Sequence, residues 1–135
     1  MGQKAYSTAS SKSEEKEKTP HLNQIDELGK ELSSVLDLDE LEGHIYLNLL
    51  RTGPITASAL AKELDIDRAK TYRTIDRLVS ESIVSTTFSN PKLCIPIDPE
   101  EALKIVLRKK QDEINKIKKL GEKIIKKVKA IVTEG

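Results

Sequence analysis

The sequence has few of the residues that build disulfide frameworks, aromatic cores and membrane spans. Its one cysteine, Cys94, cannot form an internal disulfide, so a reducing compartment is the expected location. The sequence has no tryptophan and one phenylalanine, which predicts an aliphatic core. No apolar run approaches the ~18 residues of a membrane span, and the N-terminus lacks a signal-peptide core. We therefore expect a cytoplasmic protein with no membrane partner.

Residues that hold metals or perform catalysis are also sparse. His21, His44 and Cys94 are scattered rather than set at ligand spacing, which argues against a metal site. No general base accompanies Cys94, and no glycine-rich phosphate loop is present. We expect no cofactor and no enzymatic activity. Cys94 is interpreted as a small apolar strand residue, with redox sensing left open as the alternative.

Charge is abundant but unevenly distributed. The 135 residues include 33% charged ones, with a net charge of +1. Residues 1–60 carry a net −4 and residues 61–135 a net +5. Between Lys104 and Lys129 there are 11 basic and 3 acidic residues, a net +8. A near-neutral total is therefore compatible with a polyanionic partner, because the local patch sets the field.

The sequence divides into three parts. Residues 1–18 are rich in Ser, Lys and Glu, which predicts a disordered tail. Thr19 and Pro20 are typical of a helix start, and the apolar spacing that follows predicts an amphipathic helix over 20–36. We assign residues 19–98 to a domain that includes this helix, and residues 99–133 to a long final helix.

Cap and turn residues divide the central domain into short elements. Asp39 and Glu42 form a capping-box pattern for a helix that ends at Gly53. Thr56 then caps a helix over "ASALAKEL", and Asp67 caps a helix over 67–82 after a tight turn. Turn residues within "IVSTTFSNPKLCIPI" predict a β-hairpin. This order predicts a mainly α fold, a winged helix-turn-helix with a small β-hairpin.

Residues 67–82, "DRAKTYRTIDRLVSES", predict a helix with an aliphatic side and a cationic side. At 100° per residue, one sector that we expect to face the core contains Tyr72, Ile75, Leu78, Val79 and Ile83. Lys70, Arg73 and Arg77 lie opposite, with Thr74 and Ala69 beside them. Such side chains can contact guanine edges or phosphates. A merely solvated face is the alternative.

In a winged helix-turn-helix the second helix enters the major groove, and the hairpin reaches the adjacent backbone or minor groove. On this basis the residues expected to contact DNA are Thr56, Ser58, Arg68, Ala69, Lys70, Thr71, Arg73, Thr74, Arg77, Asn90 and Lys92.

The final helix carries an imperfect heptad pattern. At ~33 residues it is ~50 Å long, too long for a small domain to cover, so we expect it to join two chains in a homodimer. A partly frayed tail helix is the alternative. The residues expected at the dimer contact are Leu103, Val106, Leu107, Ile114, Ile117, Leu120, Ile124, Val128 and Ile131.

Residues 36–107 resemble the DNA-binding domain of the TrmB-type archaeal transcriptional regulators, relatives of the MarR-like winged helices. The matching positions are Tyr46-Leu47, Leu49-Leu50-Arg51, Gly53, Thr56-Ala57, Leu60-Ala61, Arg68, Lys70, Tyr72, Leu78, Pro91-Lys92 and "PIDPEEAL". The resemblance implies transcription regulation by binding double-stranded DNA, and a nucleoid-associated location.

The sequence departs from the family pattern at two places in the predicted DNA-binding domain. Asp65 stands where the helix-turn-helix usually has glycine, although Asp tolerates the left-handed conformation, and the wing has fewer arginines.

Sugar-responsive members carry a large C-terminal effector domain, whereas this sequence stops after its long helix, so we expect a short form with no small-molecule effector site. The leading hypothesis is a sequence-specific homodimeric regulator. A protein–protein adaptor and a chromatin-like binder without sequence preference remain as alternatives.

Overall fold

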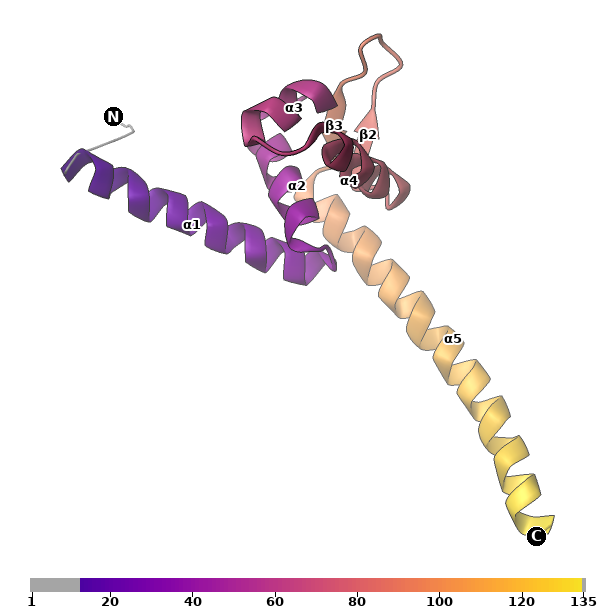
Figure 1. Ribbon diagram of the computed structural model, residues 1–135. Coiled ribbons are helices and arrows are strands. Elements are labelled where there is room, and N and C mark those ends of the chain that lie inside the picture. The colour runs from indigo at the N-terminus through magenta and orange to yellow at the C-terminus, as the bar shows by residue number, and fades with distance from the viewer. Residues whose placement is uncertain (1–12, 135) are drawn as a thin grey trace. The chain divides into compact units, whose positions relative to one another are not determined.

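A computed structural model describes residues 13–134, with the backbone alone for 13–22. The described residues form five helices and one two-stranded sheet (Figure 1). In order these are α1 (Ser13–Leu36), α2 (Glu40–Thr52), α3 (Ala57–Leu64), α4 (Arg68–Ser80), β2 (Val84–Thr86), β3 (Cys94–Pro96) and α5 (Pro99–Glu134). The chain divides into two compact units, one ending at Asp98 and the other beginning at Pro99, and each is described by itself.

Helix α1 begins earlier than the sequence signals indicated. It starts at Ser13, so Thr19 and Pro20 lie inside the helix rather than at its start. Residues 13–18, which the sequence analysis assigned to the tail, belong to this helix in the structure, and residues 1–12 lie outside the described residues. Glu and Lys dominate the segment 13–18, and both are good helix formers. That propensity accounts for the earlier start.

Helix α1 packs on α2 through small residues. Gly29 and Ser33 are buried, and the Ser33 hydroxyl donates to the Gly29 carbonyl at 2.8 Å. A Cβ added at Gly43 of α2 would lie 1.7 Å from Ser33 Oγ and 3.1 Å from the Gly29 oxygen. Glycine at position 43 is therefore what allows the two helices to approach so closely.

The predicted capping box at the start of α2 is confirmed. The Glu42 amide donates to Asp39 Oδ1 at 2.7 Å, and the Asp39 amide donates to Glu42 Oε1 at 2.9 Å. Helix α2 ends at Thr52, and Gly53 follows with a φ of 87°, its amide donating to the Leu49 carbonyl. A positive φ suits glycine, because it lacks the Cβ that would clash.

Helices α3 and α4 form a helix-turn-helix. Thr56 accepts from the Ala59 amide at the start of α3, and Asp67 accepts from the Lys70 amide at the start of α4. Both predicted caps are confirmed. Asp65 adopts the left-handed conformation (φ 54°, ψ 49°) between the two helices, as expected for a turn where glycine is usual. Helix α4 ends at Ser80, two residues before the predicted end.

The predicted hairpin is also confirmed. Strands β2 and β3 run antiparallel with Val84 opposite Pro96 and Thr86 opposite Cys94. Ile55, between α2 and α3, makes an isolated bridge to Cys94. This bridge ties the entrance of the helix-turn-helix to the base of the wing, the loop that joins β2 to β3 (Figure 1).

The core of the first unit is aliphatic apart from one tyrosine. Its fully buried large side chains include Ile45, Leu49, Leu60 and Leu78. Tyr46 is also completely buried, and its hydroxyl donates to the Ile97 carbonyl at 2.7 Å. Burial, with a smaller contribution from Asp98, raises the pKa of Tyr46 to about 12.

Helix α5 has 36 residues, a length of about 54 Å at 1.5 Å per residue. It begins at Pro99, with Glu100 and Glu101 in its first turn. None of the described helices combines the length and the apolar character needed to cross a membrane.

Candidate nucleic-acid interface

The buried face of α4 is rotated from the predicted one. Ile75 and Leu78 are buried as expected, but Tyr72 and Val79 are 40% and 37% exposed. Thr71 and Thr74 are buried in their place. The predicted placement of the two threonines on the exposed face is therefore wrong. Their hydroxyls donate to the carbonyls of Asp67 and Lys70, both at 2.9 Å, so each threonine satisfies its polar group within the helix and can be buried.

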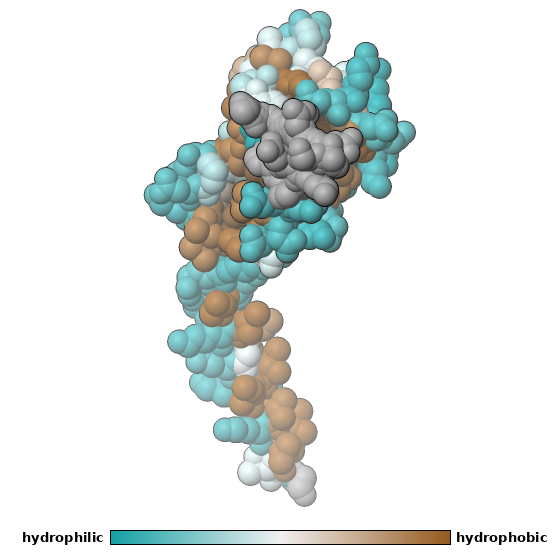
Figure 2. Space-filling model, turned by 90° about the vertical axis from the view of Figure 1, so that its left-hand side faces the viewer, coloured by the Kyte–Doolittle hydropathy of each residue, from teal (hydrophilic) through white to brown (hydrophobic). Residues whose placement is uncertain are grey.

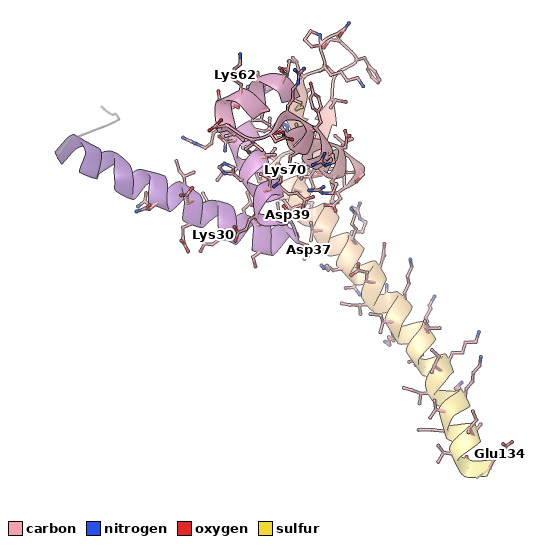
Figure 3. All side chains as sticks on the ribbon, viewed as in Figure 1. Lys30, Asp37, Asp39, Lys62, Lys70 and Glu134 are labelled. Atoms are coloured by element: carbon pink, nitrogen blue, oxygen red, sulfur yellow. The ribbon has the colours of Figure 1, made fainter. Side chains whose placement is uncertain are left out.

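The solvent face of α4 presents long cationic side chains. Lys70 and Arg73 are exposed and form no ion pair with any residue that the structure describes. Figure 3 shows Lys70 on this helix. Ala69 is also exposed, leaving room between the two long side chains. Of the predicted contact residues, these three lie together on the accessible side of α4.

The first turn of α4 adds a third cation. Arg68 is exposed, and its guanidinium carbon lies 5.7 Å from the centroid of the Tyr72 ring, within the range of a cation–π contact. The contact orients Arg68 without neutralising it. The helix N-terminus lies at the same place, and its amides favour anions.

Arg77 differs from these residues because it is held by acidic partners. Its Nε lies 3.4 Å from Glu42 Oε2, and its Nη2 lies 3.6 Å from Asp39 Oδ2. The Glu42 side chain is only 8% exposed, whereas that of Arg77 is 51% exposed. Arg77 therefore bridges both members of the α2 capping box and joins α4 to α2. This geometry gives it a structural role in the free protein.

The remaining predicted contacts border a hollow between α3, α4 and the wing. The hollow has a volume of about 690 Å³, and Thr56, Ser58 and Arg68 lie on its helical side. Asn90 and Lys92 of the wing lie on its other side, and both are exposed. The structure thus brings the predicted wing residues and the first turn of α4 to one face.

The floor of this hollow includes Cys94. Its side chain is buried, and burial, together with the nearby Asp76 carboxylate, raises the pKa of the thiol. A raised pKa keeps the sulfur protonated and weakly nucleophilic. The geometry favours the interpretation of Cys94 as a small apolar strand residue.

Three residues on this surface were missed by sequence reasoning. Tyr72 and Asp76 lie on the exposed side of α4 and line the hollow, and Phe88 lies at the tip of the wing with 105% exposure. A signal for Phe88 was present, because the single phenylalanine of the sequence falls between turn residues rather than in a periodic apolar segment.

Helix α5 carries an exposed apolar stripe. Figure 2 shows hydrophobic and hydrophilic side chains on two sides of this helix. Of the predicted dimer contacts, eight are exposed and Val106 is buried. Ile125 and Val132 also belong to the exposed apolar set, although the heptad pattern did not include them. The other side of α5 carries most of the lysines between 104 and 129.

No group of three or more His, Cys, Asp and Glu side chains that could hold a metal ion occurs in the described part of the chain.

Comparison with known proteins identifies the family of the chain. The family model described as sugar-specific transcriptional regulator TrmB matches residues 32–100. The sugar-sensing transcriptional regulator TrmBL1 of Pyrococcus furiosus is 28% identical over 91 residues, 67% of this chain and 27% of that protein. An uncharacterised Bacillus subtilis protein, YrhO, is 30% identical over 88 residues, 65% of this chain and 32% of that protein. The chain thus spans less than a third of the length of these two relatives.

Among solved structures, the archaeal chromatin protein TrmBL2 superposes with a TM-score of 0.72 at 18% identity, covering 78% of this chain and 40% of that one. A likeness at this identity supports the fold, and the family match covers the helix-turn-helix and its wing. The chain therefore belongs to the TrmB family of transcriptional regulators.

Proposed function

We propose that the chain binds specific DNA sequences as a homodimer and regulates transcription through this binding. The observation that supports the proposal is the α4 face, where Arg68, Lys70 and Arg73 are exposed on a helix-turn-helix and form no ion pair with the acidic residues that the structure describes. Cations fixed on such a helix can contact guanine edges and phosphates once the helix enters a major groove. Asn90 and Lys92 of the wing would contact the backbone beside it.

The exposed apolar stripe of α5 supports the dimer. Large apolar side chains recur along most of a helix of about 54 Å, at the spacing of a coiled-coil seam. A second copy presents the same stripe, so the two can cover each other in an isologous contact. Two recognition helices joined in this way would read half-sites about 10 base pairs apart, or a multiple of that spacing.

A chromatin-like function without sequence preference is the second candidate. It is favoured by the net +8 between Lys104 and Lys129, which would attract phosphates irrespective of base sequence. The structural likeness to TrmBL2, an archaeal chromatin protein, also favours this candidate.

Competition binding separates the two candidates. Labelled genomic fragments retained by the chain are challenged with an excess of random duplex at several salt concentrations. A specific regulator should bind its own fragments at least roughly 10³-fold more tightly than it binds random duplex. Equal competition by random DNA would contradict sequence specificity and support the chromatin-like function. Absence of binding even at low salt would contradict both and support an adaptor role.

A further inference from the structure

The most unusual surface residue of the first unit is Phe88. It is the single phenylalanine of the sequence and is fully exposed at 105%. Its neighbours from Ser89 to Lys92 are exposed as well, so no local apolar cluster covers the ring. Full exposure of an aromatic ring calls for an explanation, because a covered aromatic side chain removes roughly 150–250 Å² of surface from water, among the largest areas of any residue.

Hydrogen bonds on both sides of Phe88 hold the wing tip together. The Thr87 amide donates to the Leu93 carbonyl at 3.0 Å, and the Leu93 amide donates to Thr87 Oγ1 at 2.9 Å. Beyond the ring, Ser89 Oγ lies 2.6 Å from Thr87 Oγ1 and donates to the Pro91 carbonyl at 2.9 Å. Phe88 is thus presented by a cross-bonded loop.

The wing tip borders the same face as the first turn of α4. Asn90 and Lys92 line the hollow of about 690 Å³ together with Arg68 and Tyr72. When α4 occupies a major groove, the wing therefore meets the neighbouring backbone and minor groove. Apolar side chains of minor-groove proteins insert there as wedges, partly unstacking one base step and bending the duplex.

We infer that Phe88 is an apolar wedge that enters the DNA minor groove beside the α4 site. Asn90 and Lys92 contact the flanking phosphates and hold the wing in place while the ring lies against sugars and a base step. Flexible pyrimidine–purine steps accept such a wedge at the lowest deformation energy. An apolar contact releases no counterions, so its contribution to affinity is independent of salt. This inference rests on the proposed DNA-binding function.

The test measures affinity and DNA bending for the full chain with the Phe88→Ala, Phe88→Leu and Lys92→Ala variants, on a genomic fragment that the wild type retains. Phe88→Ala should weaken binding about tenfold, in the range of aromatic–base stacking, with an unchanged slope of log affinity against log salt and a reduced bend. Phe88→Leu, which keeps an apolar wedge, should retain most of the bend.

Lys92→Ala should instead lower the salt slope, by about 0.9 for one lost phosphate contact. Val35→Ala, which trims another exposed apolar side chain, is the matched control and should change neither quantity.

Wild-type affinity and bend in Phe88→Ala would overturn the wedge while leaving the proposed function intact. A change of oligomeric state in Phe88→Ala without a change in bend would assign the ring to a contact between copies, and would also overturn it. If the wild type binds no DNA, the proposed function fails and the wedge with it.

Discussion

Replacing Arg77 by alanine separates the structural role of this residue from a role in DNA contact. The substitution removes two ion pairs, to Asp39 at 3.6 Å and to Glu42 at 3.4 Å. Arg77 is half exposed, so solvent screens both pairs, and exposed pairs contribute roughly 0.2–1 kcal/mol each. Glu42 is nearly buried, which places the loss toward the upper end, although its bond to the Asp39 amide remains. We expect the free energy of unfolding to fall by about 1–2 kcal/mol.

The assay is urea unfolding followed by circular dichroism, for Arg77→Ala, Glu42→Gln and the double variant. Because the two side chains are in contact, the double-mutant cycle should give a coupling energy of about 0.5 kcal/mol or more. Lys70→Ala is the matched control, since Lys70 is an exposed α4 cation that pairs with no acidic residue in the described part of the chain, and its loss should leave unfolding nearly unchanged. Unaltered stability in Arg77→Ala, with a lower salt slope of DNA binding, would refute the structural role and restore Arg77 as a phosphate contact.

Three further results follow from the structure. Gly43→Ala should destabilise the fold by about 1–3 kcal/mol through overpacking against Ser33 and Gly29, whereas Gly29→Ala, whose added Cβ would meet only Leu47 at 3.6 Å, should be tolerated in the same unfolding assay. The raised pKa of Tyr46, about 12 against an ordinary 10.0, means that the folded state keeps a proton that the unfolded chain loses. The free energy of unfolding should therefore fall as pH rises from about 10 to 12, and Tyr46→Phe should lack this component; an equal pH dependence in both proteins would contradict it. Ile117→Asp should turn a dimer into a monomer by light scattering, because it places a charge in the apolar stripe of α5, while Lys119→Asp on the other side should stay dimeric; monomers for the wild type would refute the proposed interface.

Local chemistry made much of the fold predictable. Asp39, Thr56 and Asp67 cap the helices that they were expected to cap, because a cap depends on residues within one turn. Asp65 adopts the expected left-handed turn for the same reason. The hairpin likewise follows from turn residues between two short apolar runs.

Features that depend on distant contacts were not predictable. The exposed side of α4 was misplaced because buried threonines count as polar in a periodicity argument, whereas Thr71 and Thr74 satisfy their hydroxyls within the helix. The acidic partners of Arg77 lie 35 or more positions away along the chain, and periodicity within one helix says nothing about them. The start of α1 was misplaced because Thr19 and Pro20 outweighed a charged run of good helix formers.

The central claim is that the exposed cations of α4 bind DNA. The most direct measurement is the affinity of the chain for a retained genomic fragment across a salt series, comparing the wild type with a Lys70→Ala and Arg73→Ala double variant and with a Lys30→Ala and Lys62→Ala control. Loss of two α4 phosphate contacts should lower the affinity and reduce the slope of log affinity against log salt by about 1.8. The helix content of the variant should be unchanged. The control variant, with its substitutions on α1 and α3, should bind as the wild type does. Equal affinity and equal slope for the α4 variant and the wild type would contradict the account.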